Sequence, residues 1–364
     1  MREKKVTALA LLAVCFGPTL LADQPRFVNV RLETRSGANL SAAFDAIPRA
    51  ERKPVWMGYS VPAISERHLT CCSDSERYRA VQGCGLCRLE LRESFNVVTD
   101  DRHSVKLEGH DSAAILIRME NRRPEKVRVF SSDCELDAGG LRVYWLNDVK
   151  LDESVALLAS FVKTTYQIND EAGLDARLGD DALAAIAFHA GSAADIELET
   201  FASAGHAEKL RENAAFWLGS ERGRFGYEVL SRLVRNDLSP EFREKAVFAL
   251  YVSKEPQAED ALIGAARSDE SPRVRGQALF WLAQKASHKA ASVITGAIEH
   301  DAETEVKKKA VFALSQLPKD EGVPILIDVA RDNRNPEVRK QAMFWLGQSN
   351  DLRALEFFAR VLGH

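Results

Sequence analysis

The sequence predicts an α+β protein in two parts: a β-rich N-terminal domain followed by an α-solenoid of stacked helical hairpins. Two observations lead to this fold class. Before residue 150, apolar and polar residues alternate with a period of two in several runs, as in half-buried strands. After residue 211, the same apolar residues recur every 32 positions, which is typical of helical-repeat proteins.

The first 22 residues have the parts of a secretory signal peptide. Basic residues precede a short apolar stretch, Val6 to Phe16, and Ala22 offers a small residue at a cleavage site. The stretch is too short for a comfortable membrane span, and no other apolar run approaches that length. We therefore expect a secreted or periplasmic protein with no membrane span after removal of residues 1–22. The alternatives are an uncleaved N-terminal anchor and a lipoprotein site at LAVC (12–15).

Residues 23–150 form the expected β-rich domain. Alternating runs at 27–35, 113–120, 126–131 and 141–146 predict strands. LSAAFDAI (40–47) predicts a short helix, and we expect WMGYSVP (56–62) at a surface loop or a strand end. The helical region opens with LDESVALLASFV (151–162), where Asp152 or Ser154 would serve as the N-cap.

The cysteines of this domain are expected to form disulfides. Of the six cysteines in the chain, five remain once Cys15 is removed with the signal peptide, and an oxidising compartment favours their pairing. The candidate disulfide residues are Cys71, Cys72, Cys84 and Cys87, and Cys134 has no assigned partner. Zinc binding and a redox-active CGLC are the alternatives. No metal site is assigned, because adjacent cysteines fit poorly together in one tetrahedral site.

Phenylalanine, leucine and alanine mark the 32-residue repeat. Leucine follows each repeated phenylalanine by two positions, and alanine precedes it by two. Each unit contains two helical stretches that cannot bury their apolar faces alone, so neighbouring units must stack. We predict a solenoid over residues 151–364, with clear repeats from about residue 212 and degenerate units before. A second apolar series keeps the same period at Leu230, Leu262, Ile294 and Leu326.

The unit PEVRKQAMFWLGQSNDLRALEFFARVL (336–362) resembles the HEAT repeats in their short form, also called HEAT-like or PBS-lyase-type. The hallmark of that form is Pro-x-Val-Arg-x-x-Ala followed by Leu-Gly. This sequence meets it at Pro336, Val338, Arg339, Ala342, Leu346 and Gly347. The resemblance implies stacked helical hairpins over about 212–364 and says nothing about residues 23–150. Further upstream, FHAG (188–191) resembles a decayed FWLG, offset by 28 residues instead of 32.

A ladder of charged residues also follows the period. A basic residue recurs at each unit, and an acidic or amide residue precedes four of these basic residues by six positions. The resemblance implies that such residues tie neighbouring repeats together and fix their stacking; a stripe for anionic partners is the alternative. The ladder comprises Asp237, Arg243, Asp269, Arg275, Asp301, Lys307, Asn333 and Arg339.

Three units carry an adjacent Phe–Trp pair, in AAFWLG (214–219), ALFWL (278–282) and AMFWLG (342–347). A helical wheel places the tryptophans on the core stripe, alternating with Ala249 and Ala313, and places the phenylalanines away from it. The phenylalanines either pack on neighbouring repeats or line a recognition surface, where aromatic residues are common anchors. The candidate partner-binding residues are Phe216, Phe248, Phe280, Phe312 and Phe344.

No catalytic or cofactor-binding motif is present, so no catalytic residue and no cofactor is assigned. The formal net charge of −4 gives no general attraction to nucleic acid. We expect a non-enzymatic scaffold of the bacterial cell envelope or secreted space that binds a protein or peptide on its solenoid. The alternatives are a lyase-type or accessory enzyme related to PBS-lyase HEAT-like proteins, some of which attach bilins to phycobiliproteins, and a metal or redox sensor acting through the N-terminal cysteines.

Overall fold

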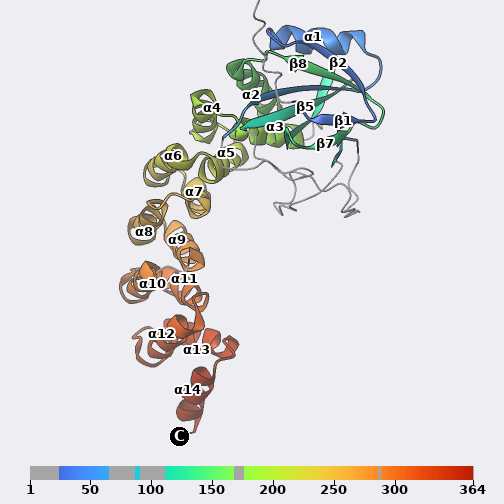
Figure 1. Ribbon diagram of the computed structural model, residues 1–364. Helices are drawn as coiled ribbons and strands as arrows, with labels where there is room; N and C mark the ends of the chain where they lie inside the picture. The colour runs from blue at the N-terminus through green and yellow to red at the C-terminus, as the bar shows by residue number, and fades with distance from the viewer. Residues whose placement is uncertain (1–23, 65–86, 91–110, 168–175, 286–287, 364) are drawn as a thin grey trace, which may run out of the picture.

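The computed structural model describes residues 24–64, 87–90, 111–167, 176–285 and 288–363. A sheet-containing N-terminal region is followed by consecutive helices, which extend away from the sheets as a row of stacked pairs (Figure 1). The fold class expected from the sequence is confirmed. The expected signal peptide, residues 1–22, lies outside the described residues.

Two sheets form the N-terminal region. The larger has the strand order β2-β8-β3-β5-β6, and the smaller has the order β1-β7-β4. In the larger sheet β8 pairs in parallel with β2 and β3, while β5 is antiparallel to β3 and β6. The strands are β1 (Arg26–Val28), β2 (Arg31–Ser36), β3 (Val55–Pro62), β4 (Cys87–Arg88), β5 (Ser112–Glu120), β6 (Arg123–Ser131), β7 (Glu135–Asp137) and β8 (Arg142–Asn147).

Strand β3 lies at the centre of the larger sheet, so the expectation of a surface loop or strand end for WMGYSVP is wrong. Met57 and Tyr59 belong to the core shared with the helices, while Trp56 belongs to the core beneath the smaller sheet. Gly58 pairs with Trp145, and a Cβ atom at residue 58 would lie 3.0 Å from that indole. A strand buried on both faces is continuously apolar and shows no alternation.

Three helices share a hydrophobic core with the larger sheet: α1 (Leu40–Ala50), α2 (Leu151–Gln167) and α3 (Ala176–Phe188). The Asn39 side chain caps α1 by accepting a hydrogen bond from the Ala42 amide. Helix α2 begins at residue 151, as expected, but the Ser154 hydroxyl is buried against β3 and does not cap the helix. The same core continues into the solenoid, and the expected division into two domains near residue 150 stays a prediction.

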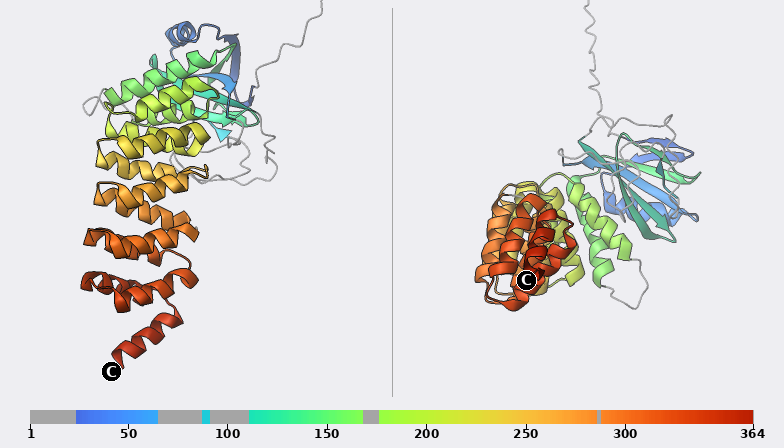
Figure 2. Two further views of the ribbon diagram at one scale, coloured as in Figure 1. Left: turned by 90° about the vertical axis from the view of Figure 1, so that its left-hand side faces the viewer. Right: turned by 90° about the horizontal axis from the view of Figure 1, so that it is seen from below.

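The remaining helices form the solenoid. The first helices of successive pairs, from α5 to α13, form one row, and the second helices, from α6 to α14, form another (Figure 1, Figure 2). Helices α7, α9 and α13 begin at proline, which suits the first turn of a helix. The helices are α4 (Ser192–Ala202), α5 (Glu208–Glu221), α6 (Gly223–Asn236), α7 (Pro240–Val252), α8 (Ala258–Ser268), α9 (Pro272–Lys285), α10 (His288–His300), α11 (Thr304–Ser315), α12 (Lys319–Asp332), α13 (Pro336–Gln348) and α14 (Leu352–Leu362).

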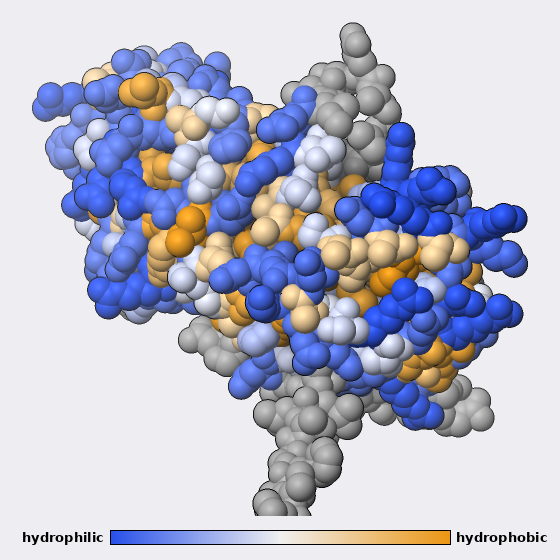
Figure 3. Space-filling view, turned by 90° about the horizontal axis from the view of Figure 1, so that it is seen from above, coloured by the Kyte–Doolittle hydropathy of each residue, from blue (hydrophilic) through white to orange (hydrophobic). Residues whose placement is uncertain are grey.

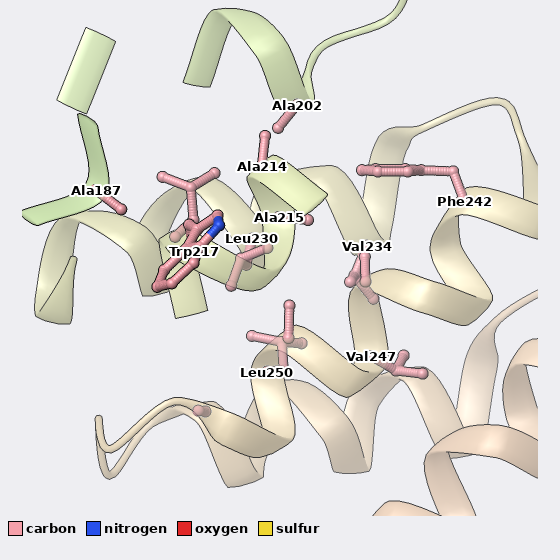
Figure 4. Packing of buried hydrophobic residues seen from close by; sticks show 14 of the residues in the cluster. Ala187, Ala202, Ala214, Ala215, Trp217, Leu230, Val234, Phe242, Val247 and Leu250 are labelled. Carbon is pink, nitrogen blue, oxygen red and sulfur yellow. The ribbon is translucent and has the colours of Figure 1, made fainter. Parts of the chain in front are cut away.

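Close helix contacts explain the small residues of the repeat. Trp217 lies beside Ala187 of α3 and Leu230 of α6 in the core (Figure 4). A Cβ atom at Gly219 would lie 2.2 Å from the carbonyl oxygen of Ala249, so glycine lets α5 approach α7. The close approach of α5 to α7 therefore depends on glycine at this position.

The surface seen from above is mostly hydrophilic, with small hydrophobic patches between the charged areas (Figure 3). Several of the most exposed large hydrophobic residues lie on α14, among them Leu352, Leu355 and Leu362. Within the described ranges, no helix is both long and apolar enough to cross a membrane.

Candidate functional site

The first helices of the solenoid pairs carry a continuous row of aromatic side chains, which we call the aromatic ridge. Its members are the five repeated phenylalanines together with Trp281 and Trp345. The 32-residue repeat places the phenylalanines at equivalent positions of α5, α7, α9, α11 and α13, and the two indoles contact them from the next position along α9 and α13. The first four phenylalanines are half-buried, and Phe344 is 55% exposed.

Every member of the ridge contacts the next one. Ring centroids are 6.1 Å apart between Phe216 and Phe248 and 5.8 Å apart between Phe280 and Phe312, with the rings stacked in both pairs. The tryptophans bridge the remaining gaps. Trp281 lies 4.7 Å from Phe248 and 4.8 Å from Phe280. Trp345 lies 4.8 Å from Phe312 and 5.0 Å from Phe344. The ridge is thus packed along its length and open to solvent on one side.

The tryptophans do not all lie in the core as the helical wheel indicates. Trp217 is 8% exposed, but Trp281 and Trp345 are half-buried. The reason is that each of these two rings reaches across to the preceding repeat, where it meets Phe248 or Phe312. The alternating small residues, Ala249 and Ala313, are buried as expected.

Uncharged and basic side chains flank the ridge. Residues three before and four after a helical position lie on the same face as that position. No acidic residue occurs in either series. The three residues four positions after Phe280, Phe312 and Phe344 are all glutamines, and all are exposed. The two series are Asn213, Lys245, Gln277, Lys309 and Gln341 before the phenylalanines, and Ser220, Val252, Gln284, Gln316 and Gln348 after them.

The charged ladder forms buried rungs between consecutive turns. Arg243 donates two hydrogen bonds of 2.8 Å to the Asp269 carboxylate, and Arg275 donates bonds of 2.7 and 2.9 Å to Asp301. Each arginine is therefore paired with the aspartate 26 residues later. The aspartate six residues earlier contributes its backbone carbonyl: Arg243 donates to Asp237 O at 2.7 Å, and Arg275 donates to Asp269 O at 2.8 Å.

The aspartates of the rungs also order the turns. The carboxylates of Asp237, Asp269 and Asp301 accept hydrogen bonds from backbone amides two residues later. Burial alone would raise the pKa of the Asp301 carboxyl, but its bonds from Arg275 and from the Glu303 amide hold that pKa below its usual value. Arg211, the first basic residue of the 32-residue series, makes a further rung to Asp237.

The C-terminal members of the ladder are arranged differently. Lys307 donates to the carbonyl of Glu299, and Arg339 donates to the carbonyl of Asn333 at 2.7 Å. The Asn333 side chain accepts from the Asn335 amide, as the aspartates do in their own turns. At this rung an amide replaces the carboxylate and a lysine replaces the arginine, so the bidentate pair is lost.

The predicted cysteine cluster lies mostly outside the described ranges, which exclude Cys71, Cys72 and Cys84. Cys87 of β4 and Cys134, which precedes β7, are both buried and both disulfide-bonded. The pairing expected among the four candidate cysteines stays a prediction. In the part of the chain that the structure describes, no three His, Cys, Asp or Glu side chains are placed to hold a metal ion.

Sequence reasoning missed a buried polar cluster where the solenoid meets the larger sheet. This junction cluster consists of Tyr59, Ser154, His189 and Arg222. The Ser154 hydroxyl is hydrogen-bonded to Tyr59 Oη at 2.9 Å and to His189 Nε2 at 2.8 Å. His189 Nδ1 lies 2.7 Å from the Ala185 carbonyl, so this nitrogen carries the ring proton. Burial, assisted by the charge of Arg222, lowers the pKa of His189 to about 4.

Arg222 completes the junction cluster from the other side. It donates to the carbonyls of His189 at 2.6 Å and Gly191 at 3.1 Å, and to the Asp195 carboxylate at 2.6 Å. Tyr59, Ser154 and His189 are completely buried, and their hydrogen bonds connect the larger sheet to helix α2 and to the residue that follows α3. The irregular spacing of FHAG was the one sign of this site in the sequence.

Comparisons with known proteins agree with the repeat pattern. Residues 227–315 and 291–364 match the family model of HEAT repeats. The complex of CpcE and CpcF of phycocyanin lyase from Nostoc sp. PCC7120 is similar over 43% of this chain and 99% of that chain, with 24% identity and a TM-score of 0.34. YibA from E. coli is similar over 46% of this chain and 64% of its own, with 26% identity and a TM-score of 0.33. No curated protein matches the sequence. The match to HEAT repeats therefore covers residues 227–364, the C-terminal part of the solenoid.

Proposed function

We propose that this protein is a non-enzymatic scaffold that binds a segment of a partner protein along the aromatic ridge. The observation that carries the proposal is the continuity of the ridge. Seven aromatic side chains contact one another across five repeats, and each keeps part of its surface open to solvent. Rigid aromatic side chains are frequent anchors of protein–protein binding.

The packing of the ridge suits a preformed binding surface. Six of the seven rings contact a ring of a neighbouring repeat, and Phe344 packs on Trp345 of its own helix, so little conformational entropy is lost when a partner covers them. Adjacent helices lie about 8–10 Å apart, so five repeats present a strip of roughly 40 Å. An extended segment of about a dozen residues would cover that strip.

The flanking side chains indicate what kind of segment would bind. The glutamines beside the ridge can donate and accept hydrogen bonds at once, which matches the amide groups of an extended backbone. The only charged residues in the two flanking series are Lys245 and Lys309. A neutral or acidic segment therefore meets no like charge from these two series.

We also propose that the chain works after export, in the bacterial envelope or the secreted space. The apolar N-terminal stretch and the use of cysteine in the first half support this. Mass analysis of the mature protein from its natural host is expected to show that residues 1–22 are missing. A mature chain that still begins at Met1 would contradict export by cleavage.

Site-specific photo-crosslinking on the full chain tests binding at the ridge. A photoreactive amino acid at Gln348, one turn after Phe344, is expected to capture a partner in the native host. Phe344→Ala removes the most exposed ring of the ridge and should lower that capture several-fold. Because Phe344 is 55% exposed, the melting temperature should change little.

The matched control places the same photoreactive group at Arg267, an exposed residue on α8 in the other row of helices. Capture at Arg267 is expected to be weak and unchanged by Phe344→Ala. Equal capture at both positions, or capture at Gln348 that is insensitive to Phe344→Ala, would show that the ridge is not the binding surface.

A further inference from the structure

The two half-buried tryptophans of the ridge stand 64 residues apart, at equivalent positions in repeats that are two units apart. Their neighbours in the ridge are equivalent as well. Trp281 contacts Phe248 and Phe280, and Trp345 contacts Phe312 and Phe344, all at centroid distances between 4.7 and 5.0 Å. The surroundings of the two indoles differ at the residue that covers the ring.

Around Trp281 the chain supplies its own covering ring. Tyr251, the penultimate residue of α7, stacks on Trp281 with a centroid distance of 4.6 Å and an interplanar angle of 27°. Lys285 approaches the same tyrosine, with Nζ 6.0 Å from the ring centroid. The face of Trp281 is therefore covered from within the molecule.

Around Trp345 the equivalent of Tyr251 is Ser315, and the equivalent of Lys285 is Ser349. Both replacements are small. A hollow of about 200 Å³ opens here between α11, α12 and α13, with Trp345 and both serines in its lining. We call it the Trp345 notch. Its floor is apolar, formed by Leu314, Val323 and Leu326.

The size and rim of the notch limit what can enter it. Sites for small-molecule ligands usually occupy about 300–1,000 Å³, so this hollow suits a single side chain better than a whole metabolite. Its polar lining consists of amide and hydroxyl side chains and Lys319, with no carboxylate. An aromatic residue in a neutral or acidic segment fits both the flat indole and this rim.

We propose that the Trp345 notch receives an aromatic side chain of the partner, which stacks on Trp345 as Tyr251 stacks on Trp281. The proposal rests on the function proposed above and adds the chemistry of the partner's anchor residue. The chain's own Tyr251 is the template, because it fills the same place two repeats earlier. In the partner-bound state an aromatic ring would cover each of the two indoles: Tyr251 on Trp281, and the side chain of the partner on Trp345.

Fluorine NMR on the full chain labelled with 5-fluorotryptophan tests the proposal directly. The probes are N-acetyl-tyrosine amide and, as the matched aliphatic control, N-acetyl-leucine amide. The Trp345 resonance, assigned with Trp345→Phe, is expected to shift in a saturable way with the tyrosine probe. The leucine probe should shift it at least threefold less. The Trp281 resonance should not respond, because Tyr251 covers that indole.

Two reciprocal variants exchange the residues at the covering positions of Trp281 and Trp345. Ser315→Tyr is expected to fill the Trp345 notch, abolish the response of Trp345 and raise the melting temperature by about 1–2 °C. Ser315→Ala is the control and should keep the response. Tyr251→Ser should open the other site and make the Trp281 resonance respond. No response of Trp345 in the native chain, an equal response to both probes, or a retained response in Ser315→Tyr would overturn the proposal.

The crosslink at Gln348 separates this proposal from the function proposed above. Ser315→Tyr should lower the capture of the partner several-fold, whereas Ser315→Ala should not. If Phe344→Ala lowers capture and Ser315→Tyr leaves it unchanged, the ridge binds the partner and the assignment of the notch is wrong.

Discussion

The junction cluster and the rungs of the solenoid both use a buried arginine to hold polar groups together, but only the rungs repeat. Arg222 binds several backbone carbonyls and one carboxylate from the α3–α4 region, and no equivalent set of contacts occurs in the later repeats described. Arg243 and Arg275 make the same contacts one after the other along the chain. Stacked units of the same kind are thus held by one interaction used repeatedly, whereas their attachment to a sheet requires an interaction of its own.

The largest effect is expected from removal of the unique arginine. Arg222→Ala leaves the carbonyls of Ala187, His189 and Gly191 and the Asp195 carboxylate without this donor, and the first two carbonyl contacts are buried. Leaving such groups unpaired should lower the free energy of unfolding by about 3–5 kcal/mol. Thermal melting followed by circular dichroism measures the loss.

Arg224→Ala, two residues away, is the control for that variant. Arg224 is 83% exposed in its side chain and pairs only with Glu228 one helical turn later. Its removal should cost less than about 0.5 kcal/mol. If both variants melt at the same temperature, the junction cluster does not hold the sheet to the helices.

Removal of one rung should lower the free energy of unfolding by less than removal of Arg222, because the rungs on either side remain. Arg275→Ala breaks the bidentate pair with Asp301. The side chains of Arg275 and Asp301 are only 12% and 8% exposed, so the free energy of unfolding is expected to fall by about 2 kcal/mol. Hydrogen exchange should show the loss mainly in α9 and α11. Arg331→Ala, which removes an exposed arginine paired with Asp328, should leave the exchange unchanged. A uniform loss of protection over the whole chain would mean that the rungs do not act locally.

The remaining prediction concerns the pH dependence of stability that the junction cluster causes. The pKa of His189 is about 4 in the folded chain against 6.5 for an ordinary histidine, because burial disfavours the charged ring. Between these values the unfolded chain binds a proton that the folded chain does not. Stability should therefore fall as the pH drops from about 6.5 towards 4, by at most about 1.4 kcal/mol per pH unit. His189→Gln should flatten this slope in urea unfolding measured at several pH values; an unchanged slope would exclude His189 as its source.

Features that repeat could be predicted from the sequence. A period of 32 residues sufficed for the stacked hairpins, for the arginines and aspartates of the rungs at Arg243 and Arg275, and for the equivalent positions of the five phenylalanines. It did not give the partner of each arginine, because residues six apart and residues 26 apart are equally regular in a 32-residue repeat. The choice between them depends on which turn approaches the guanidinium in space.

Features that occur once could not be predicted in the same way. Ser154 resembles an N-cap, because it lies near the start of a helix, but its hydroxyl is directed to Tyr59 of a strand almost a hundred residues earlier. WMGYSVP lacks alternation because it is buried on both faces, and pattern alone does not separate such a strand from a loop. The Trp345 notch depends on a serine in place of the equivalent tyrosine. The sequence contains that difference, but only the structure shows that the tyrosine covers an indole.

The rung at Lys307 and Asn333 has a mechanical consequence. Between α11 and α13 the bidentate arginine–aspartate pair of the earlier turns is absent. Lys307 stands in place of the arginine and donates to the backbone carbonyl of Glu299, and Asn333 stands in place of the aspartate and accepts from the amide of Asn335. Each repeat of a solenoid contacts only its neighbours, so the stiffness of each interface depends on its own contacts. The interface between α11 and α13 is therefore expected to bend more easily than those between α7 and α9 and between α9 and α11. The last unit carries Trp345 and Phe344. Its orientation can therefore adjust to the shape of a bound partner, while the orientation of the earlier units stays fixed.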